Sequence, residues 1–380
     1  MLDLNPIVIL GSMKIAILHD FLIKLGGAER VVKVLADMFP DAPIYTLFYD
    51  EKKVGNTFPA NRIVTSKLQK TWKLIGKRHR FLLHKIPQAI EEFNFSDFDI
   101  VLSSNTAYAH GAIVPTDTTH ICYCHAPMRF AWDWANEYKK ENHITGFKKV
   151  LYSIIMKKMR IWDAVSADRP DIYLANSKNT AGRIKKYYRL DSEVVFPPVN
   201  IERFKVTPEH DDYFLIVSTL TPYKKIDLAV SLFNKIGKKL VIIGGGSHRD
   251  YLESIAGDNV EFLGFQSDES VTEYIQNCRA FIFPGEEDFG MTPVEAMAAG
   301  KPVLGFGKGG CLETIVPGIT GELFYNQTTE SMEEGLCRLL ENEDSYDHDV
   351  IRKYSEQFGL KAFQDKIMEL VKNVENTLNS

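Results

Sequence analysis

Residues 14–39 read KIAILHDFLIKLGGAERVVKVLADMF and contain the unit that is repeated through the chain. The first six of these residues enclose the apolar run Ile15–Leu18, which contains two β-branched residues and is typical of a strand buried on both faces of a parallel sheet. Gly26 and Gly27 then provide a turn, and the Val and Leu residues after them predict a helix that ends at Pro40. The stretch therefore predicts a strand, a glycine-rich turn and a helix, in that order.

The same alternation continues along the chain. Further strands are predicted at 44–48, 99–103, 120–124 and 171–175 and, in a second series, at 213–217, 239–243, 259–263, 279–283 and 302–305. Helices are predicted at 66–85, 147–165, 178–188, 226–236, 249–256, 269–277 and 293–299. Strands that recur every ~25–30 residues with helices between them indicate parallel, right-handed βαβ units.

Two domains are expected, because the stiff sequence FPPV separates the two series and 380 residues suit two cores. We predict an α/β fold of two facing, Rossmann-like, doubly wound domains with an interdomain cleft. The predicted parts are an extension at 1–12, a first domain at 13–200, a second domain at 201–355 and a C-terminal helix within 356–380 that packs back on the first domain.

Composition places the chain among ordinary globular proteins. Apolar residues make up 45% and charged residues 25% of the sequence, which excludes disordered, collagenous and coiled-coil classes. No apolar run reaches the ~20 residues that span a bilayer, and the run at 7–10 is too short for a signal peptide. Five scattered cysteines favour a reducing, cytoplasmic location over a disulfide framework.

Formal charge is divided unevenly. Residues 1–200 carry a net charge of +8 and residues 201–380 a net charge of −13, which together give the total of −5. Either the first half faces an anionic partner, or the two surfaces differ by chance.

The strongest candidate site lies in the loop 284–293, since ligands of doubly wound sheets bind beyond the carboxyl ends of the strands. The sequence EDFGMTPVE places Glu287 in this loop and Glu295 in the first turn of the following helix. Two carboxylates beside a helix N-terminus suit a sugar or ribose next to a phosphate. Alternatively, Glu295 only complements the helix dipole and Glu287 is solvated.

Two loops of the first half are further candidates. In the loop 20–27, Gly26 and Gly27 allow a close approach to a phosphate or acceptor hydroxyl, or serve the turn alone. In the loop 122–133, His125 and Arg129 follow a strand, and His125 suits proton handling. The adjacent Cys-x-Cys-His spacing lacks a second cluster to complete a zinc set, so we expect no metal.

Cations and glycines after the strands of the second half offer weaker signals. Lys224 and Lys225 follow the strand at 213–217 and suit an anionic leaving group, or are a solvated surface pair. The run Gly244–Gly246 resembles a dinucleotide fingerprint, but its third glycine position holds Arg249, which disfavours a nicotinamide oxidoreductase.

A basic segment at 61–90 contains eight Lys or Arg residues and no acid, with apolar residues between the cations. A basic amphipathic helix favours anionic lipid headgroups. Nucleic acid is a competing partner for this segment, but the sequence contains no recognised nucleic-acid-binding module. Alternatively, the segment is a surface helix whose apolar face packs on the domain core.

In order, HD (19–20), GGAER (26–30), HAPMRFAWD (125–133), NSK (176–178), FPPV (196–199), PYK (222–224) and EDFGMTPVE (287–295) form a specific set. From Met13 to about Asn373 the chain resembles the retaining glycosyltransferases of family 4, which have the GT-B fold. Within this family, the sequence most resembles the bacterial mannosyltransferases of polysaccharide assembly.

This resemblance implies roles for individual residues. Glu287 would contact the donor sugar, Glu295 the nucleotide ribose and Lys224 the diphosphate, while His125 would approach the reacting carbon. Donor-binding residues would further include Lys225, Gly290, Met291, Thr292 and Thr219, and the acceptor or phosphate loop would include Asp20, Gly26, Gly27 and Arg129. Thr219 stands where the family commonly has Arg, and this loss of a bidentate phosphate contact puts the strength of the activity in question.

The expected function is therefore transfer of a hexose, with mannose as the best candidate, by a retaining and metal-independent enzyme. The donor would be a nucleotide-diphosphate sugar such as GDP-mannose, with no other cofactor, and the acceptor a growing, polyprenyl-diphosphate-linked glycan. The enzyme would be cytoplasmic and peripheral on the anionic inner membrane face through 61–90, and would not bind nucleic acid. A GT-B epimerase or hydrolase and a non-catalytic nucleotide-sugar-binding protein stay open as alternatives. The base, sugar, linkage, acceptor and oligomeric state do not follow from the sequence.

Overall fold

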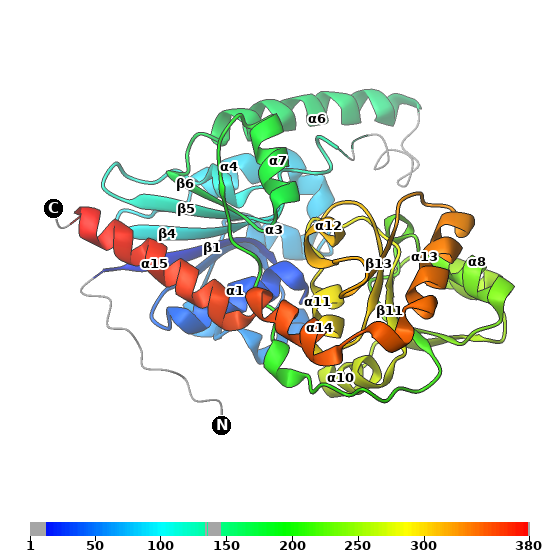
Figure 1. The fold of residues 1–380 in the computed structure, drawn as a ribbon. Helices are drawn as coiled ribbons and strands as arrows, with labels where there is room; N and C mark the ends of the chain where they lie inside the picture. The colour runs from blue at the N-terminus through cyan, green and yellow to red at the C-terminus, as the bar shows by residue number, and fades with distance from the viewer. Residues whose placement is uncertain (1–12, 134, 136–145, 379–380) are drawn as a thin grey trace. The chain divides into compact units, whose positions relative to one another are not determined.

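The structure is a computed structural model that describes residues 13–133, 135 and 146–378. The chain forms two compact units. The first runs to Val195 and resumes at Gln364, and the second spans Phe196–Phe363. Each unit contains a parallel sheet covered by helices (Figure 1).

The first unit has a seven-stranded sheet in the order β3-β2-β1-β4-β5-β6-β7, and every neighbouring pair is parallel. Its strands are β1 (Ile15–Leu22), β2 (Ile44–Tyr49), β3 (Ile63–Thr65), β4 (Ile100–Asn105), β5 (Thr119–Cys124), β6 (Ile172–Ala175) and β7 (Glu193–Val194). Its helices are α1 (Gly27–Met38), α2 (Glu51–Val54), α3 (Leu68–Leu74), α4 (Ile86–Glu91), α6 (Gly146–Ser166) and α7 (Lys178–Tyr187), with the 3₁₀ turns η3 (His79–Lys85) and η4 (Ala109–Gly111). The strand order reverses between β1 and β4, which is where doubly wound sheets open for a ligand.

The second unit has a six-stranded parallel sheet in the order β10-β9-β8-β11-β12-β13. Its strands are β8 (Phe214–Val217), β9 (Leu240–Ile243), β10 (Val260–Gly264), β11 (Ala280–Phe283), β12 (Val303–Phe306) and β13 (Gly321–Phe324). Its helices are α8 (Ile226–Ile236), α9 (Arg249–Ile255), α10 (Asp268–Asn277), α11 (Met291–Ala298), α12 (Cys311–Thr314), α13 (Thr329–Glu341) and α14 (His348–Ser355), with the 3₁₀ turn η6 (Pro222–Lys224) before α8. Here the reversal lies between β8 and β11.

The helices pack on the sheets through their apolar faces. In α1, Val31, Val32 and Leu35 are buried, while the opposite face is polar. Fully burying such side chains contributes roughly 1.5–3 kcal/mol each. The prediction of two parallel α/β domains is confirmed, because apolar β-branched runs alternate with helices of this kind.

One predicted helix is broken. The segment 66–85 contains α3, which ends at Leu74, and then η3. Between them Gly76 and Lys77 both adopt positive φ angles, of 70° and 61°, which a continuous helix does not allow. The expectation of one basic amphipathic helix was therefore wrong.

The division between the units falls at Val195, shortly before the predicted boundary at 200. The last helix, α15 (Leu360–Leu378), contributes its residues from Gln364 onward to the first unit. There Lys366 forms an ion pair with Glu193 at 2.7 Å, and Ile367 and Val371 are buried. Among the described residues, no helix combines the length and the apolarity that crossing a membrane requires.

Candidate active site

Two histidines and a serine meet near the carboxyl ends of three neighbouring strands of the first unit. His19 lies in β1, Ser104 in β4 and His125 directly after β5. His19 Nδ1 lies 2.9 Å from the carbonyl oxygen of Ser104 and 3.1 Å from its Oγ, and Ser104 Oγ lies 2.8 Å from His125 Nε2. A carbonyl oxygen only accepts, so His19 Nδ1 carries a proton, and the serine hydroxyl is left to donate to His125.

The two histidines differ in protonation. Burial opposes a charge on His19, but the neighbouring carboxylate of Glu29, at 3.9 Å from Nε2, raises the pKa of His19 overall. Burial, and then repulsion from His19, lowers the pKa of His125 to about 3. His125 is therefore a neutral imidazole at pH 7 that accepts a hydrogen bond through Nε2.

Glu29 and the glycine turn support this cluster. The Glu29 carboxylate accepts a 2.8 Å hydrogen bond from the backbone N–H of Gly26, which caps α1, and Gly27 begins the helix. A Cβ on Gly26 would lie 2.9 Å from Glu29 Oε2, so a side chain at this position would displace the Glu29 carboxylate. The glycine pair thus brings a helix N-terminus and a buried carboxylate to the edge of the sheet.

Asp20 serves the backbone. It is fully buried, and its carboxylate accepts hydrogen bonds from the backbone N–H groups of residues 106 to 109 at 2.6–2.9 Å and from Thr106 Oγ1 at 2.5 Å. Its oxygens are committed to the loop after β4, so Asp20 positions this loop. Arg129 is partly buried in the loop after His125.

The Cys-x-Cys-His spacing forms no metal centre in the described part of the chain. Cys122 and Cys124 are both buried in β5, and burial raises the pKa of the Cys122 thiol to about 12. No group of three or more His, Cys, Asp or Glu side chains among the described residues is arranged to hold an ion.

The second unit brings together Lys224 and Glu287. Lys224 ends η6 after β8, and Glu287 lies in the loop after β11, on the two sides of the strand-order reversal. The Lys224 ammonium forms an ion pair with Glu287 Oε1 and lies 5.8 Å from the ring centroid of Phe283. A Cβ on Gly285 would lie 2.9 Å from the Lys224 backbone, so this glycine lets the two loops touch.

Helix α11 begins two residues earlier than predicted. Gly290 is its N-cap with φ of +88°, and the helix starts at Met291. The first backbone N–H groups, including those of Met291 and Thr292, have no partner within the helix and can bind an anion. Glu295 is the fifth residue of α11 and therefore lies beyond the first turn, where it was predicted. Its side chain is buried, and Arg203 Nη2 lies 3.9 Å from its Oε1.

The remaining predicted donor residues flank this loop. Thr219 is exposed after β8, and Lys225 adopts a left-handed conformation at the start of α8. The Gly244–Gly246 run packs against their loop, since a Cβ on Gly244 would lie 1.9 Å from the Ser218 carbonyl oxygen. Close packing of the backbone therefore explains these glycines without a bound dinucleotide.

Sequence reasoning missed several of the residues that build these sites. Glu29, His19 and Ser104 support His125, and His19 stood in a quoted motif without a role. Gly309 and Gly310 support Glu287: the Gly310 N–H donates to the Glu287 carbonyl at 2.9 Å, and a Cβ on Gly309 would lie 2.2 Å from the same oxygen. The Gly-Gly pair after Lys308 was the available signal.

Models of two protein families match the two halves of the chain. Residues 25–203 match the family described as Glycosyltransferase Family 4, and residues 199–358 match Glycosyl transferases group 1.

Curated relatives carry related names. The chain is 24% identical over 227 residues to an uncharacterized glycosyltransferase, MJ1178, of Methanocaldococcus jannaschii, covering 58% of this chain and 64%, less than two thirds, of that protein. It is also 24% identical to the alpha-1,3/1,6-mannosyltransferase ALG2 of Dictyostelium discoideum, over 96% of this chain and 99% of that protein.

A solved structure shares the fold. The crystal structure of Anabaena Alr3699/HepE in complex with UDP matches with a TM-score of 0.69 and 16% identity, over 95% of this chain and 100% of that chain.

Replacing Glu29 with Gln tests the electrostatics of the histidine cluster. Because Glu29 raises the folded-state pKa of His19, the stability that it contributes through His19 is present at low pH and is lost as pH rises through that pKa. Glu29→Gln should therefore lower the free energy of unfolding more at pH 5.5 than at pH 8.5, as measured by urea denaturation. Glu92→Gln, at an exposed site, is the matched control, and a Glu29→Gln deficit that does not change with pH would contradict the assignment.

Proposed function

Because the chain belongs to the glycosyltransferases and consists of two parallel α/β domains of the GT-B type, we propose that it transfers mannose from a nucleotide-diphosphate sugar to a lipid-linked glycan. The observation that carries the proposal is the Lys224–Glu287 pair at the strand-order reversal of the second unit. One cation for a phosphate and one carboxylate for hydroxyl groups match the two ends of such a donor. The name of the full-length relative, a mannosyltransferase, supports mannose.

Lys224 and the start of α11 would stabilise the leaving group. When the bond between the anomeric carbon and the phosphate oxygen breaks, negative charge collects on the diphosphate. The Lys224 ammonium and the free N–H groups of α11 are fixed donors for that charge, and such preorganised donors cost no reorganisation during reaction. This arrangement assigns to Lys224 and the backbone the charge neutralisation that a metal ion supplies elsewhere, and no further cofactor is proposed.

Glu287 and Glu295 would hold the donor by its hydroxyl groups. Glu287 accepts from the sugar and Glu295 from the ribose, in line with their places in the loop and in α11. Lys225, Gly290, Met291, Thr292 and Thr219 would complete the donor site. Because Thr219 stands where the family commonly has Arg, binding of the diphosphate would depend on Lys224, Lys225 and the N-terminus of α11.

Configuration at the anomeric carbon would be retained. We propose that the acceptor hydroxyl attacks from the face that the diphosphate leaves, while a phosphate oxygen takes the acceptor proton. The electron pair of the broken C–O bond stays on the diphosphate, and the new C–O bond forms to the acceptor. His125, neutral and oriented by Ser104, would contact the sugar near this carbon, with Gly26, Gly27 and Arg129 on the acceptor side.

The basic segment 61–90 would bind the anionic cytoplasmic face of a membrane, which places the enzyme in the cytoplasm as a peripheral protein. The structure reduces the number of cations available for this contact. Arg62 donates to three backbone carbonyls between residues 36 and 42, and Lys77 pairs with the buried Asp50 at 2.5 Å. Lys70, Lys73, Arg78 and Lys85 are exposed and form no ion pair with any described residue.

Replacing Lys224 with Met should reduce kcat for donor turnover by about 10²–10³-fold, the usual cost of losing one preorganised charge-stabilising group. Release of nucleoside diphosphate from GDP-mannose and from UDP-sugars is the measurement, with EDTA present and absent. Lys235→Met, on the exposed face of α8, is the matched control. A Lys224→Met enzyme with wild-type turnover would refute the role.

The triple variant Lys70→Gln, Lys73→Gln, Arg78→Gln should bind anionic vesicles more weakly. Each cation near such a surface contributes about 1 kcal/mol, so the loss amounts to roughly a hundredfold in partition constant. Co-sedimentation with phosphatidylglycerol vesicles measures it, and Lys52→Gln, Lys53→Gln, Lys235→Gln is the control with equal charge change. Equal sedimentation of the two triple variants would remove the membrane contact from this segment.

A further inference from the structure

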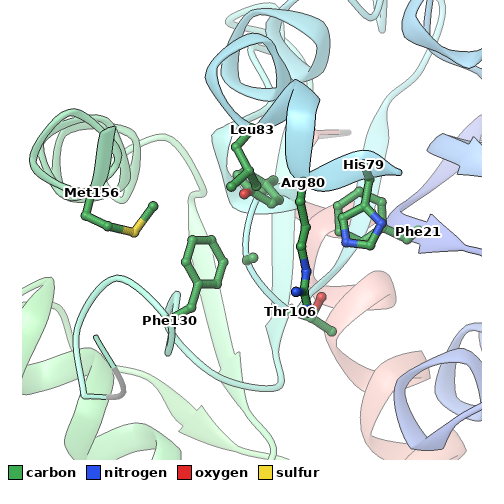
Figure 2. A pocket seen from close by; sticks show the side chains of 9 residues that line it. Phe21, His79, Arg80, Leu83, Thr106, Phe130 and Met156 are labelled. Carbon is green, nitrogen blue, oxygen red and sulfur yellow. The ribbon is translucent and has the colours of Figure 1, made fainter. Parts of the chain in front are cut away.

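A pocket of about 270 Å³ opens in the first unit (Figure 2). It is lined by Phe21, His79, Arg80, Leu83, Thr106, Ala107, Tyr108, Phe130 and Met156. Met156 and Phe130 lie on one side and Phe21 and His79 on the other, and Arg80 extends toward Thr106. No role assigned above accounts for this pocket.

The pocket lies next to the proposed reaction site. Phe21 follows His19 and Asp20 along β1, and Thr106 follows Ser104 at the end of β4. The Asp20 carboxylate accepts hydrogen bonds from the backbone N–H groups of residues 106 to 109, and residues 106 to 108 form one wall of the pocket. This wall is therefore preorganised, and it begins two residues after Ser104 of the histidine cluster.

The lining combines apolar surface with positive charge. Phe21, Leu83, Phe130 and Met156 supply rings and aliphatic groups, and no Asp or Glu lines the pocket. Arg80 supplies the positive charge of the lining. Burial, followed by repulsion from Arg80 and Lys24, lowers the pKa of His79, so the His79 ring adds no charge at pH 7. An anionic head on an apolar body fits both features.

The size fits a short stretch of chain. A cavity of ~150 Å³ is enough to hold a benzene molecule in a protein core. A pocket of about 270 Å³ thus accommodates on the order of ten carbon atoms, which is part of a lipid chain and not a whole lipid.

Helix α6 shows where such a chain would come from. While Met156 faces the pocket, Val150, Leu151, Ile154, Ile161 and Val165 are at least half exposed. Exposed lysines at 149, 157 and 158 lie among them, and the single acid between 146 and 166 is Asp163, which is fully buried. An outward helix face of aliphatic and cationic side chains is the pattern of a helix that lies in an anionic membrane surface.

We propose that this pocket binds the first isoprenoid units of a prenyl diphosphate lipid, with Arg80 at the phosphate, and that the outward face of α6 contacts the bilayer that supplies it. The proposal rests on the proposed function, because it names the lipid part of the acceptor. It adds a binding site and a second membrane-contacting element to the basic segment.

Binding of farnesyl diphosphate to the full chain tests the pocket, measured by calorimetry beside farnesol and inorganic diphosphate. Leu83→Gln should weaken farnesyl diphosphate binding about tenfold, whereas Leu74→Gln, in the same segment but outside the pocket, should not change it. Arg80→Gln should weaken farnesyl diphosphate and leave farnesol unchanged. Thermal melting and donor binding confirm that each variant is folded.

Vesicle binding tests α6. Ile154→Glu with Ile161→Glu, at 50% and 56% exposure, should lose at least tenfold in binding to phosphatidylglycerol vesicles. Ile113→Glu with Ile319→Glu, at 52% and 47% exposure on loops, makes the same change elsewhere and should bind as wild type.

Three results would overturn the proposal. They are equal farnesyl diphosphate affinity of Leu83→Gln and wild type, inorganic diphosphate that binds as tightly as farnesyl diphosphate, and an α6 face that proves by analytical ultracentrifugation to join two copies of the chain. Sugar transfer to a prenyl-diphosphate-linked glycan that Leu83→Gln does not impair would reject the pocket and keep the transferase. Pocket-dependent lipid binding without any sugar transfer would reject the transferase function and keep the lipid-binding pocket.

Discussion

The buried carboxylate of Asp20 is the interaction on which the first unit's candidate site depends. Removing a carboxylate from water costs several kcal/mol, and five hydrogen bonds from residues 106 to 109 offset that cost. They tie the end of β1 to the loop after β4. Ser104, near the end of β4, lies between the two histidines, and the loop that follows forms a wall of the apolar pocket. One buried charge therefore positions both the polar cluster and the lipid-sized pocket.

In the second unit, close approaches of the backbone do comparable positioning. Gly285 lets the Glu287 loop touch Lys224, Gly309 and Gly310 hold that loop from the other side, and Gly244 packs under Ser218. At each position a side chain would meet backbone atoms that cannot move aside cheaply. The loops that carry the acid and the cation are thus held by main-chain contacts.

Much of this architecture followed from local pattern. Strands such as β9 and β11 were predicted within a residue because short apolar runs between turns have few other solutions. The candidate loops followed from topology, since strand ends of a parallel sheet meet at one edge. The break at Gly76 and Lys77 could not be predicted from the sequence, because the amphipathic spacing on either side is compatible with one helix. Nor could Arg62 and Lys77 be distinguished from surface cations, since their partners, backbone carbonyls and a buried Asp50, are brought near only by the fold. The Glu29–His19–Ser104–His125 contacts link four segments for the same reason.

The return of α15 has a consequence for biosynthesis. The first unit comprises residues up to Val195 and again from Gln364, and Ile367 and Val371 of α15 are buried in it. A ribosome adding ~5–20 residues per second needs on the order of ten seconds or more to make the intervening second unit. During that interval the nascent first unit has its sheet but lacks its last helix, and the apolar surface that α15 covers is open to chaperones. Emergence of α15 from the ribosome, and not completion of the seventh strand, is therefore the event that completes this domain.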